Sequence, residues 1–425
     1  MNSEYKSLKI SEGHRFNNFV GENDYEVQNT FIKFTTKDDE EIWKFLERKI
    51  NEEYYVFDDN TSNILINNCF IMLKNDISYR YEVLSIALYS LQFVNSPLQA
   101  FEELRIDEYF ISQLNNNIDL KTLQIILDLI ERFNDKIDDN VRINRFNDIF
   151  DILIKFSISN DPIFSQLKSS FLDVSSKLLK RFDFNENYGK QLFIFFSNNL
   201  KSYNYNFDII YIFRILESLL IRHLSLYDLF IDSNFFIFTF QQFSSQNDPL
   251  IYCSLKIFLP ILKNVKVINY FIDNNFIDLI KIKFGFFNYK VKIYIIKCIN
   301  VLIENSPVIL QQIIDSNFLK CADLFTNNFK LQLQTMKLIY KILEQNYFPN
   351  DEYIYHYTIN NSISFLSSDE PDMILLSLKI LIILHEKFHP IGNDKKELLN
   401  ELINNLSSED KEIFKFKSYL YELIN

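Results

Sequence analysis

Ile313-Ile-Asp-Ser-Asn-Phe318 repeats, almost residue for residue, two earlier segments of the chain, Phe230-Ile-Asp-Ser-Asn-Phe235 and Phe271-Ile-Asp-Asn-Asn-Phe276. A more distant copy, Arg105-Ile-Asp-Glu-Tyr-Phe110, precedes them by about three periods. Self-similarity at a fixed spacing is typical of repeat proteins, in which each unit buries its apolar face only by stacking on the next unit. The spacing is 41 and 42 residues, measured between the asparagines at the fifth place of the three close copies, Asn234, Asn275 and Asn317.

Two other markers keep the same period. Asn95-Ser-Pro97 recurs as Asn305-Ser-Pro307, 210 residues later, and Ser254-Leu-Lys-Ile257 recurs as Ser377-Leu-Lys-Ile380, 123 residues later. These distances are close to five and three periods of 42 residues. The chain is therefore predicted to repeat one structural unit rather than to contain two or three unrelated domains.

A single period contains the signals of three helices. Ser306-Pro307 favours a helix start, because proline has no N–H to leave unpaired in the first turn. A short apolar helix over 308–314 is expected, then a break at Asn317, since asparagine tolerates the left-handed conformation. A second helix over 318–325 and a longer third helix over about 330–345 follow, the third with a wide apolar stripe.

This pattern of three helices with a break residue resembles the armadillo repeat, whose close relative is the HEAT repeat. The resemblance covers about residues 60–390, most clearly 225–390, and the break asparagines stand where that family usually has glycine. It implies an all-α fold, a right-handed α-solenoid of about eight three-helix repeats in which the third helices line a concave groove. The expected third helices are Arg80–Val94, Leu120–Phe133, Ile163–Arg181, Phe207–His223, Leu250–Leu262, Val291–Glu304, Leu331–Glu344 and Met373–His389.

The ends of the chain differ in character from the repeats. Residues 1–37 are polar and aperiodic, which predicts a tail or partly docked arm, and residues 391–425 predict one or two capping helices. The solenoid is expected to occupy residues 38–390, beginning with an acid-started helix around Trp43. The stretch 134–147, rich in Asp and Asn, is expected to form a long surface loop.

Composition excludes several classes of function. The net charge of −12 argues against a general nucleic-acid binder and against adhesion to an anionic membrane, both of which need a cationic surface. The N-terminus has no apolar signal region, and no apolar run is long enough to span a bilayer. The four cysteines are widely spaced with no C-x-x-C pair, as expected of a reduced compartment. These features favour the cytoplasm, the nucleus or both.

Aligning the third helices places five cations at one position, 40 to 42 residues apart: Arg214, Lys256, Lys297, Lys337 and Lys379. The same position upstream holds Ser85, Gln124 and Asp173. Stacked helices lie about 10 Å apart, so the cations are expected to form a stripe, here called the cationic column. A second row, on nearly the same face, contains Glu131, Glu304, Glu344 and Glu386.

The cationic column predicts a non-catalytic scaffold, adaptor or regulatory subunit that binds an extended, acidic or carbonyl-rich segment of a partner protein. A simpler interpretation is also open: lysine is common on the wet strip of a packed helix, and the glutamate row would offset the cations. A third interpretation is a nuclear-transport or large-complex adaptor of the same fold. Against basic cargo stands the absence of the Trp-x-x-x-Asn ladder of the family's transport adaptors, because Trp43 is the only tryptophan.

One motif suggests an enzyme. His385-Glu386-Lys-Phe-His389 matches H-E-x-x-H, in which two histidines one helical turn apart bind zinc and the glutamate acts as general base. Pro390 follows at once, and no strand is evident to hold a substrate. We therefore expect no catalytic residue, no metal, no cofactor and no small-molecule substrate, and keep a zinc peptidase as the remote alternative. Phosphate-binding glycine motifs and G-x-S-x-G are absent.

Overall fold

The structure is a computed structural model. It describes residues 28–29, 31–52, 55–75, 77–116, 118–137, 146–159, 161–181, 184–200, 206–321, 328–347, 351–388, 391–406 and 410–424. Within these ranges all regular secondary structure is helical and no strand occurs. None of the helices in them combines the length and the apolar character needed to cross a lipid bilayer. The chain divides into two compact units, Met1–Asp183 and Phe184–Asn425.

The first unit is built from helices that pack on their near neighbours in sequence. Here α3 packs on α4, α4 on α7, α7 on α11, and α9 on α11. The helices are α2 (Glu40–Glu52), α3 (Asp59–Leu73), α4 (Arg80–Leu91), α5 (Leu98–Glu103), α6 (Ile106–Asn115), α7 (Leu120–Lys136), α9 (Asn147–Ser157), α10 (Pro162–Gln166) and α11 (Lys168–Leu179).

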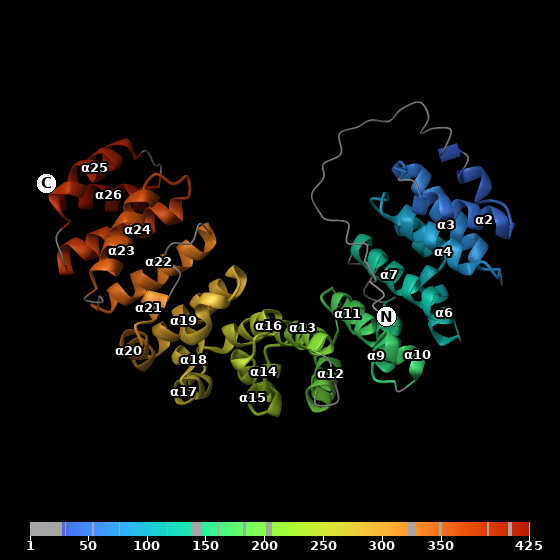
Figure 1. The fold of residues 1–425 in the computed structure, drawn as a ribbon, viewed down its shortest axis with the longest axis horizontal. Helices are drawn as coiled ribbons and strands as arrows, with labels where there is room; N and C mark the ends of the chain where they lie inside the picture. The colour runs from blue at the N-terminus through green and yellow to red at the C-terminus, as the bar shows by residue number, and fades with distance from the viewer. Residues whose placement is uncertain are drawn as a thin grey trace. The chain divides into compact units, whose positions relative to one another are not determined.

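The second unit repeats one arrangement along its length. Each of α13, α16, α19, α22 and α24 packs on the next, and Figure 1 shows α13, α16, α19 and α22 on one side, with α14, α15, α17, α18 and α20 on the other. The helices are α12 (Glu186–Asn199), α13 (Asn206–Arg222), α14 (Leu226–Ile231), α15 (Asn234–Gln241), η2 (Gln242–Ser244), α16 (Asp248–Phe258), η3 (Leu259–Ile261), α17 (Val265–Asp273), α18 (Phe276–Lys283), η4 (Phe284–Phe286), α19 (Tyr289–Asn305), α20 (Pro307–Asp315), α21 (Phe318–Cys321), α22 (Phe329–Glu344), α23 (Glu352–Phe365), α24 (Pro371–Ile383), η5 (Leu384–Phe388), α25 (Asn393–Asn405) and α26 (Lys411–Ile424).

Helices are found at all eight places where a third helix was expected: α4, α7, α11, α13, α16, α19, α22 and α24. The prediction that 163–181 is one helix was wrong, because the chain turns at Leu167 between α10 and α11. Three helices per repeat are also not universal. The segments before α13 and α24 are single 14-residue helices, α12 and α23, as in a helix pair.

Left-handed residues explain where a first helix breaks from a second. Asn275 (φ 49°, ψ 48°) separates α17 from α18, and Asn317 (φ 53°) separates α20 from α21, as predicted. Asn234 differs, since it is the first residue of α15 and the chain turns at extended Ser233 instead. Arg105 (φ 52°) is the left-handed residue before α6, so it corresponds to Asn275. The proposed alignment of 105–110 with the other copies was therefore four residues out of register.

Aromatic rings fill the space between the two layers of the second unit. Phe271 is fully buried, and its ring centroid lies 4.7 Å from that of Phe276, 5.0 Å from that of Phe258 and 5.1 Å from that of Phe240. These four rings belong to α15, α16, α17 and α18. Each buried Phe contributes about 1.5–3 kcal/mol, so the interior of one repeat depends on its neighbour.

Helices occur near both ends of the described chain. Trp43 in α2 is fully buried and donates from Nε1 to the Lys37 carbonyl (2.9 Å). At the other end α26 packs on α24 and α25. Most of the predicted tail, the middle of the predicted 134–147 loop, the end of the predicted 318–325 helix and His389 lie outside the described residues. Within the tail region, Phe31 and Thr35 are buried, so that part is docked.

Candidate partner-binding face on the third helices

The five residues of the cationic column occupy one register of consecutive third helices. Arg214, Lys256, Lys297, Lys337 and Lys379 lie on α13, α16, α19, α22 and α24, and each is partly exposed between buried neighbours. Lys297 and Lys337 both stand eight residues after the first residue of their helix. Because α19 packs directly on α22, these two ammonium groups belong to adjacent helices of one layer.

Tyrosines form a second row beside the cations, which the sequence analysis missed. The Arg214 guanidinium carbon lies 5.4 Å from the Tyr211 ring centroid, and the Lys297 Nζ lies 4.8 Å from that of Tyr294. Lys256 stands in the same way over Tyr252, at 5.5 Å. Their spacing of 41 and 42 residues was the available signal. Each such contact stabilises the cation by about 0.5–1 kcal/mol and holds it over the face of the tyrosine ring.

Two tyrosines of the row touch across adjacent helices. The rings of Tyr252 on α16 and Tyr294 on α19 meet edge to face, with centroids 4.9 Å apart. Burial, and then the nearby Tyr294, raise the pKa of the Tyr252 hydroxyl. A hydrogen bond to Tyr294 also raises this pKa, so the Tyr252 hydroxyl is already engaged with its neighbour in the row.

The cations differ in how the chain itself uses them. Lys256 forms an ion pair with Glu217 of α13, whose side chain is only 9% exposed. Burial lowers the pKa of the Lys256 ammonium, but the hydrogen bond and charge of Glu217 outweigh it and raise the pKa. Lys379 pairs with Glu412 of α26 at 2.9 Å and lies 5.0 Å from the centroid of the Phe416 ring. These two cations join neighbouring helices.

Lys297 and Lys337 have no ion-pair partner within the part of the chain that the structure describes. Lys297 lies over its tyrosine, and Lys337 is partly buried on α22 between α19 and α24. The centre of the column is thus the part whose charge is least compensated. It lies between Lys256 and Lys379, whose charges are already paired.

The glutamates of the second row have partners other than Lys297 and Lys337. Glu131 pairs with Lys177 at 2.5 Å, Glu304 pairs with Lys341, and Glu386 accepts from the Tyr419 hydroxyl. Burial, and then a hydrogen bond to Glu344, raise the pKa of the Tyr340 hydroxyl. Among the described residues, none of these four carboxylates forms an ion pair with Lys297 or Lys337.

In the first unit the corresponding position is not cationic. The Ser85 hydroxyl donates to the Tyr81 carbonyl (2.9 Å), and the Gln124 amide donates to Asp128 (3.1 Å). Asp173 pairs with Lys177 at 2.9 Å. The candidate face is therefore confined to the second unit.

The H-E-x-x-H motif falls in an irregular turn of helix. Residues 384–388 form a π-helical segment, η5, and His389 lies outside the described residues. The Nδ1 atom of His385 accepts from the Ile391 N–H at 3.0 Å. Burial is the main cause that lowers the pKa of His385, Lys396 adds to it, and Glu386 opposes it. Over the described residues, no three His, Cys, Asp or Glu side chains are grouped as a metal site requires.

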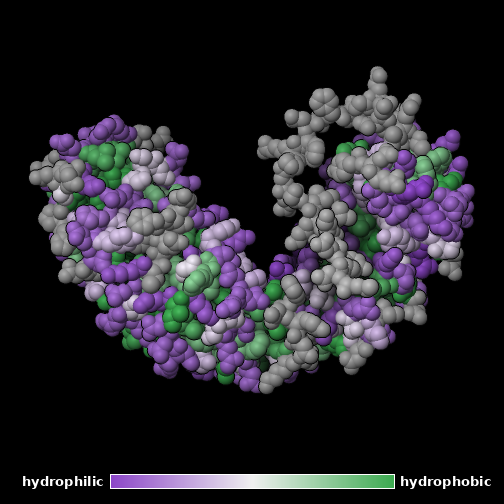
Figure 2. All heavy atoms as spheres, viewed as in Figure 1, coloured by the Kyte–Doolittle hydropathy of each residue, from purple (hydrophilic) through white to green (hydrophobic). Residues whose placement is uncertain are grey.

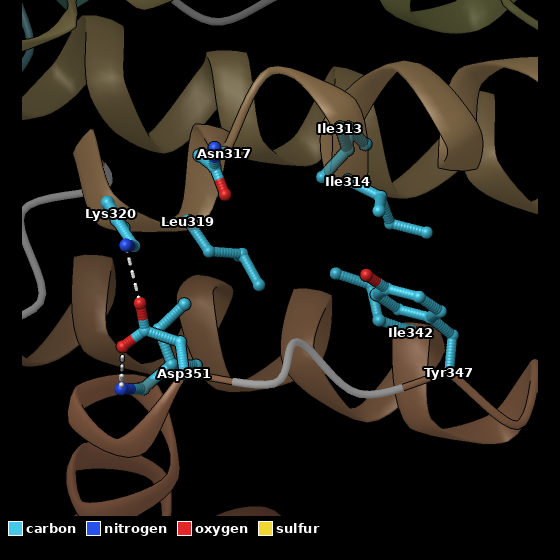
Figure 3. A pocket seen from close by; sticks show the side chains of 9 residues that line it. Ile313, Ile314, Asn317, Leu319, Lys320, Ile342, Tyr347 and Asp351 are labelled. Atoms are coloured by element: carbon cyan, nitrogen blue, oxygen red, sulfur yellow. Dashed lines mark hydrogen bonds and ion pairs between the residues drawn. The ribbon is translucent and has the colours of Figure 1, made fainter.

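A small cavity of about 140 Å³ lies between α20, α21, α22 and α23 (Figure 3). Its lining is mostly aliphatic, with an ion pair of 2.5 Å between Lys320 and Asp351 at one side. Asp351 also accepts from the N–H groups of Tyr353 and Ile354, which caps α23. The Lys320 hydrogen bond holds the pKa of the Asp351 carboxyl below its usual value. This carboxylate acts as a helix cap joined to the preceding repeat.

No family model matches the sequence, and no curated protein matches it. Among solved structures, an engineered protein from the Northeast Structural Genomics Consortium superimposes with a TM-score of 0.62 at 12% identity, over 93% of this chain and 98% of the other. Yeast importin-beta (Kap95p) matches with a TM-score of 0.46 at 9% identity, over 93% of this chain and 49% of its own length. The chain has the fold of a helical-repeat solenoid.

Proposed function

We propose that this protein is a non-catalytic scaffold or adaptor that binds an extended, acidic segment of a partner protein along α16, α19 and α22. The observation that supports the proposal is the pair Lys297 and Lys337, which lie in register on packed helices without an ion-pair partner among the described residues. A partner carboxylate beside each of these two lysines would form the same kind of ion pair that Glu217 forms with Lys256. Tyr252 and Tyr294 add a pair of aromatic rings, packed edge to face, beside the two lysines.

Charge also decides between this proposal and an adaptor for basic cargo. Lys297 and Lys337 would repel a basic peptide by about the same amount by which they attract an acidic one. Each partly exposed ion pair contributes about 0.5 kcal/mol, so binding depends on several contacts made together. We propose the cytoplasm or nucleus as the compartment, because Cys69, Cys253 and Cys298 are buried free thiols.

The test is affinity purification with the double variant Lys297→Glu, Lys337→Glu. Reversing two attractive contacts changes the binding free energy by about 2 kcal/mol, so partner affinity should fall about thirtyfold. The control is Lys190→Glu, Lys263→Glu, which reverses two exposed lysines of the second unit that lie outside the cationic column and should leave partner affinity unchanged.

The far-ultraviolet circular dichroism of both variants should equal that of wild type. The affinity of the partner's acidic segment for the wild-type protein is then measured by titration at two salt concentrations. This affinity should fall as the salt concentration rises. Retention of the partner by Lys297→Glu, Lys337→Glu at wild-type affinity would refute the third-helix face as the binding site.

A further inference from the structure

Two apolar side chains project from one edge of the second unit. Phe286 in η4 is 89% exposed, and Ile282 in the last turn of α18 is 75% exposed. They are four residues apart, Ile282 in α18 and Phe286 at the end of the 3-10 turn η4 that follows it directly. Figure 2 shows apolar residues reaching the visible surface of the second unit in small patches between hydrophilic ones.

The fold does not require these two residues to be apolar. In the preceding repeat, 41 residues earlier, the same places hold Gln241 and Ser245. The residue between them that fills the core is Phe in both repeats, Phe243 and Phe284, and both are fully buried. Positions 282 and 286 are thus apolar in this repeat although the equivalent positions of the preceding repeat are polar.

Lysines lie near the projecting pair in the sequence. Residues 281–292 contain four Lys and no Asp or Glu, in a chain whose net charge is −12. Lys292 is buried and Lys283 donates to the Ser244 and Ser245 carbonyls, and exposed Asp278 lies one helical turn before Ile282 on α18. Lys290 and Lys330 are exposed at the second positions of α19 and α22, beside half-exposed Tyr289 and Phe329. The nearest carboxylate of the preceding third helix, Asp248, accepts from the backbone N–H and side chain of Asn288 at 2.9 and 2.6 Å.

We propose that this edge, defined by Ile282, Phe286, Tyr289, Lys290 and Lys330, binds the surface of a bilayer that contains anionic phospholipid. Side chains that are 89% and 75% exposed protrude, and a protruding apolar side chain with lysines around it fits a soft planar surface better than a peptide. Phe and Ile enter the interface, while the lysine ammonium groups remain with the headgroups. The net charge of −12 opposes adhesion of the chain as a whole, but charges farther from this edge than a Debye length of about 8 Å are screened, so the lysines at the edge have the larger effect.

Flotation with extruded vesicles tests the proposal on the full chain. Wild type should bind vesicles of phosphatidylcholine and phosphatidylserine (70:30) at least tenfold more tightly than vesicles of phosphatidylcholine alone. Ile282→Gln, Phe286→Ser, which introduces the residues of the preceding repeat, should weaken binding at least tenfold through lost apolar contact. Lys290→Glu, Lys330→Glu should weaken it at least thirtyfold, since each lysine near such a surface contributes about 1 kcal/mol.

The matched apolar control is Leu224→Gln, Val265→Gln. These side chains are 72% and 69% exposed but lie at the opposite ends of the third helices, so vesicle binding should not change. Equal binding to both vesicle types, binding that survives both edge variants, or no vesicle binding by wild type overturns the proposal. Loss of a captured protein in the edge variants, with no vesicle binding, would assign the edge to a protein instead. The variant Lys297→Glu, Lys337→Glu should still bind vesicles, so this proposal and the proposed function can fail separately.

Discussion

Replacing Asn275 with Val and with Gly should separate the cost of its left-handed backbone from every other effect of the side chain. Asn275 stands between α17 and α18 at φ 49° and ψ 48°, and its side chain caps nothing. A residue with Cβ in this conformation costs about 1–2 kcal/mol, with β-branched residues at the upper end, whereas Gly costs almost nothing. We expect Asn275→Val to destabilise by about 1.5 kcal/mol and Asn275→Gly to stay within about 0.5 kcal/mol of wild type.

Asn234 provides the matched control. It occupies the same place in the same six-residue motif and is also exposed, but it is the first residue of α15 and not left-handed. Asn234→Val should therefore cost less than about 0.5 kcal/mol, as most exposed substitutions do.

The assay must report on one repeat, because a solenoid need not unfold in a single step. The Asn275 carbonyl accepts from the Leu279 N–H at 3.1 Å in the first turn of α18. Hydrogen exchange of a peptide covering 276–284, read by mass spectrometry, should speed up about tenfold in Asn275→Val. Equal effects of Val and Gly at position 275, or of Val at positions 234 and 275, would refute this account of the break.

Two further predictions concern charged groups. Glu217→Gln leaves the partly buried Lys256 ammonium without its carboxylate, so it should lower the free energy of unfolding, measured by urea denaturation, by about 2 kcal/mol. The double variant Glu217→Met, Lys256→Met should recover most of that loss, and a failure to recover it would contradict the pairing. His385 has a folded pKa below its ordinary value of 6.5, so the unfolded chain takes up a proton first as the pH falls. The urea midpoint should therefore decline below about pH 6.5, and His385→Gln should decline less; parallel profiles would exclude His385 as the cause.

The course of the helices could be predicted from the sequence because the period and the local helix signals agree. Ser306-Pro307 begins α20, Asn317 is left-handed, and Asn288 and Asn328 cap α19 and α22 with side-chain oxygens. Short-range stereochemistry determines each of these features. The register of the Arg105 copy could not be predicted in this way, because the same short string of residues can lie on either side of a break.

The cationic column shows why a sequence period predicts which residues take equivalent positions but not which of them form ion pairs within the chain. Equivalent residues recur every 40 to 42 positions, yet Lys256 and Lys379 are paired with glutamates of neighbouring helices and Lys297 is not. The pairing Glu residues stand 39 residues before Lys256 and 33 after Lys379, so no single offset identifies them. Between adjacent third helices one carboxylate and one ammonium suffice to satisfy each other, as Glu304 and Lys341 also do. A lysine of the column is left without an ion pair only where the neighbouring helix supplies no such carboxylate. Whether it does depends on the packing of two helices rather than on the sequence of one.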